Sequence, residues 1–161
     1  MDFDSGLTQC LPRLRRFAHA LSRDSADADD LTQMTVERAL VARRQWQPGT
    51  RLDSWLYRIM RNLWIDTARS RARKAKLEAP TELAEGIGAD PRPGLEAMLD
   101  LQRVMAAMAR LPDEQREVVA LILIEGFGYR EVAEMLGLPI GTVSSRLVRG
   151  RTALLEMVGK Q

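Results

Sequence analysis

An interruption in an otherwise helical pattern, from Leu77 to Gly94, divides this chain into parts. Six of its positions are proline or glycine, and acids lie among them. Such a segment cannot bury enough apolar surface to fold by itself, so it is predicted to be a flexible linker. Elsewhere apolar residues recur at helical spacing, and alternating β-branched runs are absent. The sequence therefore predicts an all-α fold with two small helical domains, residues 1–76 and 95–161, joined by a linker over residues 77–94.

Charge is distributed unevenly along the chain, although the formal net charge of its 161 residues is only +2. Residues 1–76 carry 15 Lys and Arg against 9 Asp and Glu, whereas residues 77–100 carry 1 against 6. Residues 101–161 are close to balance, with 8 against 7. The basic first half predicts a polyanionic partner, and the acidic middle is typical of a solvated tether.

Few side chains in this sequence suggest catalysis or metal binding. The only cysteine, Cys10, and the only histidine, His19, fall on different parts of one predicted helix, and nothing nearby completes a metal set. Because no nucleophile–base pair or phosphate-binding loop is found either, we predict a protein that is not an enzyme and has no cofactor. A single thiol and the lack of a signal-like or membrane-length apolar run predict a cytoplasmic protein without membrane insertion.

Three helices are predicted in the first domain. The first covers Leu7 to Leu21, and a capped restart at Asp24 to Asp27 begins a second helix that continues to Trp46. The loop Gln47-Pro48-Gly49-Thr50 breaks that helix. A third helix begins near Asp53. Its C-terminal part, called the basic end below, carries Arg69, Arg71, Arg73, Lys74 and Lys76.

Four helices are predicted in the second domain. One begins near Leu95, a second covers Asp113 to Ile124, and two shorter helices follow a break at Gly126 to Gly128. The last two, with a sharp turn at Gly137-Leu138-Pro139 between them, have the spacing of a helix-turn-helix, whose second helix enters the DNA major groove. An ordinary helical hairpin with a solvated basic face is the alternative interpretation.

The chemistry of the second helix of this pair favours DNA contact. Val143, Leu147 and Leu154 are predicted to face inward, which leaves several polar and basic side chains outward. Arg149 can form a bidentate contact with guanine O6 and N7, and Val148 can touch a thymine methyl group. The helix N-terminus suits a phosphate. The predicted DNA contacts are Thr142, Ser144, Ser145, Val148, Arg149 and Arg151.

Aromatic and basic residues interleave in the first domain, where Trp46, Trp55, Tyr57 and Trp64 lie among arginines and lysines. This mixture suits single-stranded nucleic acid, because unstacked bases can stack on rings while phosphates contact cations. Helical spacing with Ile59 and Leu63 favours a core position for Trp55, so Trp46 is the better candidate for stacking.

Three stretches together resemble the signature motifs of extracytoplasmic-function (ECF) sigma factors of bacterial RNA polymerase. They occur in the family's order, with a short acidic linker between the second and the third. The stretches are Asp27–Gln33; Ser54–Asn62 with Asp66 and Arg69; and Gly128–Ala133 continuing through Gly141–Leu147.

The resemblance implies a sigma region 2 in residues 1–76 and a sigma region 4 in residues 95–161. Region 2 of the family docks on the clamp helices of the polymerase β′ subunit, and its loop captures a base flipped from the non-template strand of the minus-ten element. The implied polymerase contacts are Asp27, Asp29, Asp30, Gln33 and Glu37. The implied minus-ten contacts are Trp46, Gln47, Pro48, Gly49, Thr50, Arg58, Arg61, Asn62, Asp66 and Arg69, with Asn62 beside the loop pocket.

Region 4 of the family reads the minus-thirty-five element as duplex through the contacts predicted above, while its earlier helices rest on the β flap. The resemblance also implies an anti-sigma factor as a partner. Two positions depart from the common pattern, because Met34 stands where an acid is usual and Ser144 where Lys or Arg is usual.

Two other functions compete with this interpretation. A plain helix-turn-helix regulator would bind duplex DNA without polymerase, but it leaves the motif at Asp27–Gln33 and the Trp46 loop unexplained. A sigma-like decoy that sequesters an anti-sigma factor has no use for Asn62, Arg149 or the basic end. We therefore predict recruitment of polymerase and strand separation without catalysis.

Overall fold

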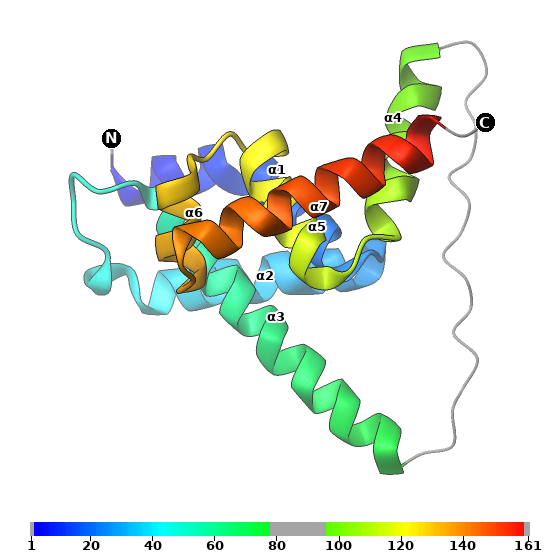
Figure 1. Cartoon of the computed structure of the whole chain (residues 1–161). Helices are drawn as coiled ribbons and strands as arrows, with labels where there is room; N and C mark the ends of the chain where they lie inside the picture. Colours follow the sequence, from blue (N-terminus) through cyan, green and yellow to red (C-terminus); the bar gives the residue numbers. More distant parts are fainter. Residues whose placement is uncertain (1, 78–95, 160–161) are drawn as a thin grey trace. The chain divides into compact units, whose positions relative to one another are not determined.

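The computed structural model describes residues 2–77 and 96–159, and it divides the chain into two compact units, Met1–Glu85 and Gly86–Gln161. All regular elements in these residues are helical, so the all-α prediction is confirmed. Both units are coloured along the sequence in Figure 1. The predicted linker over residues 77–94 lies outside the described residues except for Leu77. The first unit contains α1 (Phe3–Ser22), α2 (Ser25–Val41), a 3-10 turn η1 (Arg43–Gln45) and α3 (Leu52–Leu77).

The core of the first unit is built from one apolar face of each of its three helices. Phe17 of α1 meets Tyr57 of α3 edge to face, with ring centroids 4.9 Å apart at an angle of 87°. Burying such aromatic and aliphatic faces is the main favourable contribution to folding in a small helical unit. The buried residues are Phe3, Gly6, Leu7, Leu14, Phe17, Ala18 and Leu21 of α1; Ala28, Leu31, Thr32, Thr35 and Ala39 of α2; and Leu56, Tyr57 and Met60 of α3.

Two helix ends in this unit differ from their predicted positions. The first helix begins at Phe3 instead of Leu7, because the Asp2 carboxylate caps it by accepting a hydrogen bond of 2.8 Å from the Ser5 amide. The second helix begins where predicted, capped by Asp24, but it ends at Val41 and does not continue to Trp46. The residues after it form the 3-10 turn η1, in which the Gln45 amide donates to the Ala42 carbonyl over 2.8 Å.

The second unit contains four α-helices among its described residues, as predicted. Helix α5 passes directly into a π-helical turn, η2, in which the Glu125 amide donates to the Ala120 carbonyl. The last helix is 20 residues long, so the prediction that the two final helices are shorter than those before them is wrong for that helix. The helices are α4 (Glu96–Ala109), α5 (Asp113–Val119), η2 (Ala120–Ile124), α6 (Tyr129–Leu136) and α7 (Ile140–Gly159).

Close packing of α5 against α7 depends on Gly150, which is buried. A Cβ atom at this position would lie only 2.7 Å from Cγ2 of Val119 and 3.2 Å from Cβ of Gln115. The glycine therefore lets the two helix backbones approach, and it does not end α7. Beside this contact, the buried Arg116 donates a 2.7 Å hydrogen bond to the Leu111 carbonyl and pairs with Asp113.

Candidate nucleic-acid and protein interfaces

The acids and amides predicted to contact polymerase do not all lie on one face of α2. Asp29, Gln33 and Glu37 are exposed, follow one another at intervals of four residues, and line an open hollow with Leu11 and Arg15 of α1. The amide of Gln33 donates to Glu37 over 3.3 Å. This i, i+4 arrangement gives a continuous polar strip that a partner can contact.

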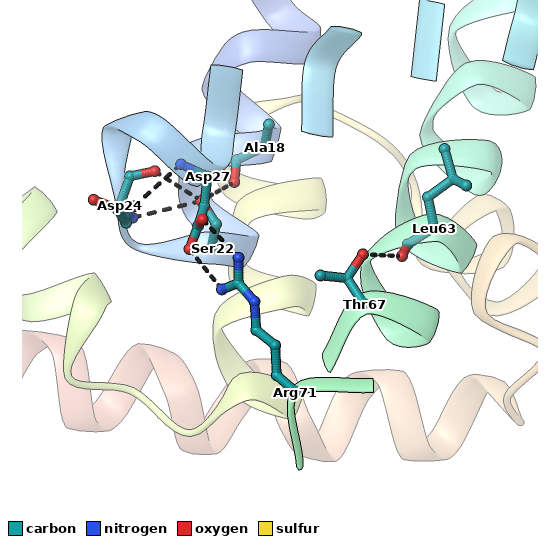
Figure 2. Close-up of polar contacts among 7 residues, drawn as sticks. All are labelled: Ala18, Ser22, Asp24, Asp27, Leu63, Thr67 and Arg71. Carbon is teal, nitrogen blue, oxygen red and sulfur yellow. Dashed lines mark hydrogen bonds and ion pairs between the residues drawn. The ribbon is translucent and has the colours of Figure 1, made fainter. Parts of the chain in front are cut away.

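Asp27 and Asp30 are not among the residues that line this hollow. Asp30 is exposed. Asp27 is half-buried and forms a bidentate ion pair with Arg71 of α3, with both N–O distances 2.7 Å (Figure 2). Hydrogen bonds from Arg71 hold the pKa of the Asp27 carboxyl below its ordinary value, although burial acts to raise it. Asp27 is therefore charged and already engaged within the unit.

The loop between η1 and α3 forms a tight turn. The Thr50 hydroxyl and amide both donate to the Gln47 carbonyl, over 2.6 Å and 3.2 Å. Gly49 has a φ of 93°, a left-handed conformation that strains residues with a Cβ. Gln47, Pro48, Gly49 and Thr50 are exposed, so the turn presents backbone and small polar groups outward.

Trp46 is half-buried, because its ring packs on Phe3 of α1 with centroids 5.9 Å apart. Phe3 also meets Trp55 of α3 edge to face at 6.0 Å, and the Arg43 guanidinium carbon lies 5.0 Å from the Phe3 ring centroid. The first turn of α1 thus supports the loop. Sequence reasoning missed Phe3, although Asp2 before it was a readable cap signal.

The predicted minus-ten residues are divided between two hollows. Trp46, Gly49 and Thr50 line one of them together with residues of α1, including Gln9 and Cys10. Asn62 and Asp66 line a different groove between α2 and α3. The sequence predicts Asn62 beside the loop pocket, but Asn62 is not among the residues that line the loop hollow. The remaining lining of that groove is Arg38, Val41, Ala42, Gln45, Trp55, Ile59 and Leu63.

Arginines extend along α3 beyond these hollows. Arg58 and Arg69 are exposed and Arg61 is half-buried. All residues from Ser70 to Lys76 are exposed as well, so the basic end of α3 presents its cations to solvent. Such a row of cations favours contact with phosphates.

Asp53 fixes the start of α3 next to the loop. It accepts hydrogen bonds from Arg51 at 2.9 Å, from Arg13 of α1 at 3.1 Å, and from the Ser54 amide at 2.8 Å. Burial acts to raise the pKa of this carboxyl, but the three donors outweigh burial and lower it. The pKa of the nearby Cys10 thiol is raised, by burial first and then by the Asp53 charge, which disfavours the reactive thiolate.

Helices α6 and α7 form the predicted helix-turn-helix. Glu131 accepts a 3.1 Å hydrogen bond from the Gly128 amide at the start of α6, and Gly137 ends α6 in the left-handed conformation with a φ of 65°. The Pro139 carbonyl then accepts from the amides of Thr142 and Val143, which opens α7. The turn that begins at Gly137 is the one of these local features that was predicted from the sequence.

The face of α7 opposite its core contacts carries most of the predicted DNA-reading residues. Val143 and Leu147 are buried and lock one side of the helix. Ser145, Val148, Arg149 and Arg151 are exposed, with Val148 59% exposed, while Thr142 and Ser144 are half-buried. An exposed valine between serines and arginines has no role in the core, and it suits contact with a base edge.

Residues 2–77 and 96–159 show neither a cluster of three potential metal ligands nor a helix long and apolar enough to cross a membrane. The second unit contains a helix-turn-helix, and the first unit is helical and carries an exposed row of cations. Together these features define a two-unit helical protein of the DNA-binding class.

Comparison with known proteins identifies the family. Residues 7–74 match sigma-70 region 2, and residues 101–154 match sigma-70 region 4. The chain is 38% identical over 148 residues to the ECF RNA polymerase sigma factor EcfG of Rhodopseudomonas palustris. This alignment covers 92% of this chain and 80% of that protein. It is 39% identical over 164 residues to the ECF RNA polymerase sigma factor SigE of Mycolicibacterium smegmatis, covering 98% of this chain and 62% of that protein.

Among solved structures, the sigma factor RpoE in complex with the anti-sigma factor NepR from Bartonella quintana is similar, with a TM-score of 0.89 and 34% identity over 99% of this chain and 98% of that one. The chain therefore belongs to the ECF sigma factors, and the resemblance of its three motifs is confirmed.

Proposed function

We propose that this chain brings core RNA polymerase to specific promoters in the cytoplasm and helps to open them, without catalysing a reaction itself. The single observation that carries the proposal is the exposed reading face of α7, held in place by the buried Val143 and Leu147. The family supplies the second half of the argument, since its members are RNA polymerase sigma factors by name.

The reading face would recognise the minus-thirty-five element as duplex. Arg149 offers a planar fork for guanine, Ser145 can donate to or accept from a base or phosphate, and Val148 offers an apolar contact to a thymine methyl group. Arg151 and the half-buried Thr142 and Ser144 would hold phosphates, which position the helix without reading sequence.

The minus-ten element would be recognised as it opens. Unstacking a base costs a few kcal/mol, and stacking or pocket contacts of about 1–3 kcal/mol per base can offset much of that cost. The turn from Gln47 to Thr50, with Trp46 behind it, is the proposed capture site. Arg58, Arg61, Asn62, Asp66 and Arg69 of α3 are the proposed contacts to the upstream part of the element.

Polymerase would dock on the exposed strip of α2 that comprises Asp29, Gln33 and Glu37, with Asp30 beside it. This surface would meet the clamp helices of the β′ subunit, and the earlier helices of the second unit would rest on the β flap. An anti-sigma factor is a further proposed partner, because the similar solved structure is a complex with one.

Run-off transcription with purified core polymerase tests this function. Core polymerase plus the chain should start at defined sites on promoter fragments, whereas core polymerase alone should not. Sequencing of the transcript starts should then reveal one shared pair of upstream elements. A chain that binds duplex DNA tightly and specifically by itself but never associates with core polymerase in a pull-down would instead be a plain helix-turn-helix regulator.

A further inference from the structure

The ion pair between Asp27 and Arg71 joins two helices through residues that are 44 positions apart in the sequence. Asp27 lies in the first turn of α2, and Arg71 lies within the basic end of α3. Each guanidinium Nη atom donates to one carboxylate oxygen, both over 2.7 Å, and this parallel geometry is the one in which such a pair is strongest and most directional (Figure 2).

The Asp27 side of the pair is held in a fixed position. Its own amide donates to the Asp24 carboxylate over 3.1 Å, so Asp27 belongs to a capped helix start. The Ser22 hydroxyl bridges the end of α1 to this cap, because it lies 2.8 Å from the Ala18 carbonyl and 3.1 Å from the Asp24 carbonyl (Figure 2). The positive end of the α2 dipole also favours a carboxylate here.

The Arg71 side is held from a second direction. The Arg71 guanidinium carbon lies 5.7 Å from the centroid of the Trp64 ring, one of the half-buried aromatics of α3. Thr67, between them, donates to the Leu63 carbonyl at 2.9 Å within the helix (Figure 2). Arg71 is therefore placed between an aromatic ring of its own helix and a carboxylate of another helix.

The basic end of α3 needs such a constraint. In Figure 1, α3 continues well past α1 and α2, the other helices of its unit. Residues from Ser70 to Lys76 are exposed, and the end carries like charges at intervals of three and four residues, as in Arg69 with Arg73. Like charges at this spacing destabilise a helix, and an unpacked helical segment of this length is marginal in water.

We propose that Asp27 is a positioning residue for promoter DNA, not a contact to polymerase. By pairing with Arg71 it fixes the direction of the basic end of α3, so that Arg69, Arg73 and Lys76, which share one face of the helix, face the phosphates upstream of the minus-ten element together. The proposal rests on the function proposed above. Asp29, two residues further along α2, keeps the role of a polymerase contact.

A matched pair of variants separates the two roles, because Asp27→Asn and Asp29→Asn each remove one negative charge from the same turn of α2. Asp27→Asn should leave the affinity for core polymerase within about twofold and slow open-complex formation by saturating holoenzyme about threefold to fivefold. Asp29→Asn should weaken the affinity for core polymerase and leave the rate of open-complex formation by saturating holoenzyme within about twofold. Hydrogen exchange in the free chain should also quicken over residues 68–76 by about threefold to fivefold in Asp27→Asn, and not in Asp29→Asn.

Arg71→Lys gives an independent control, since it keeps the positive charge for DNA but cannot form the bidentate pair. Arg71→Lys should reproduce the slower opening and the faster hydrogen exchange of Asp27→Asn. The double variant Asp27→Asn with Arg71→Lys should open promoters no more slowly, and exchange no faster, than either single variant. Additive effects, or a loss of polymerase affinity with unchanged exchange in Asp27→Asn, would overturn the proposal. Failure of the wild-type chain to support opening would count against the proposed function alone, because the exchange measurement does not involve DNA.

Discussion

Replacing Gly150 by alanine tests whether the close approach of α5 and α7 sets the stability of the second unit. The added Cβ would lie 2.7 Å from Cγ2 of Val119 and 3.2 Å from Cβ of Gln115. Val119 is 1% exposed, and its β-branched side chain is restricted at χ1, so its methyl group has little freedom to move aside. The helices must therefore separate by a few tenths of an ångström.

Two opposing terms determine the magnitude. Forcing an extra methyl group into a well-packed core costs about 1–3 kcal/mol. Alanine is favoured over glycine inside a helix by about 1 kcal/mol. We expect a net loss of about 1 kcal/mol, and since a unit of this size has a urea m-value of about 1 kcal/mol/M, the unfolding midpoint should fall by about 1 M.

Two optical probes assign the loss to a unit. All three tryptophans, Trp46, Trp55 and Trp64, belong to the first unit, so their fluorescence reports its unfolding while far-UV circular dichroism reports both units. Gly150→Ala should shift only the dichroism transition. Gly141→Ala, on the same helix with nothing within 4 Å of the new Cβ, is the control and should not destabilise.

A double-mutant cycle with Val119→Ala completes the test, because that change removes the methyl group that the new Cβ meets. The two substitutions together should be less harmful than the sum of their separate effects by about 1 kcal/mol. The packing argument fails if Gly150→Ala raises the midpoint, or if the two effects simply add.

Three of the remaining predictions concern promoter binding. Arg149→Ala should cost holoenzyme about 1–3 kcal/mol of discrimination at the minus-thirty-five element only, measured by competition with single-base variants of that element. Trp46→Ala should keep closed-complex binding in a gel shift but weaken permanganate footprints of unpaired thymines, and a premelted promoter should restore much of the loss. Phe3→Ala should resemble Trp46→Ala, because it removes the ring that supports Trp46; equal opening by wild type and Phe3→Ala would contradict this. The fourth prediction concerns pH. Because the pKa of Asp53 is lowered in the folded state, its ion pairs stabilise the first unit above about pH 4, and this stabilisation is lost as the pH falls through the pKa of the folded state. Asp53→Asn should therefore flatten the pH dependence of fluorescence-detected unfolding in that acidic range.

Much of the fold was readable from local pattern. Helix positions follow apolar spacing, and the turn before α7 follows from Gly137 and Pro139, whose backbone requirements are local. The end of α2 was not readable, because Ala42 to Gln45 contain nothing that forbids an α-helix. The close contact of α5 with α7 was not readable either, since a glycine in a helical pattern can mark either a helix end or a close contact, and only the packing of Val119 against Gly150 decides between them.

The set of predicted polymerase contacts could have been divided by helix geometry alone. Successive residues of an α-helix are 100° apart, so Asp27 and Asp29 differ by about 200° and cannot share a face. Asp29, Gln33 and Glu37 repeat every four residues and remain together, as the hollow beside α1 shows. What geometry along one helix cannot supply is the partner on the other face. That Asp27 meets Arg71 depends on how α3 crosses α2, which is fixed by the buried residues of the helices of this unit.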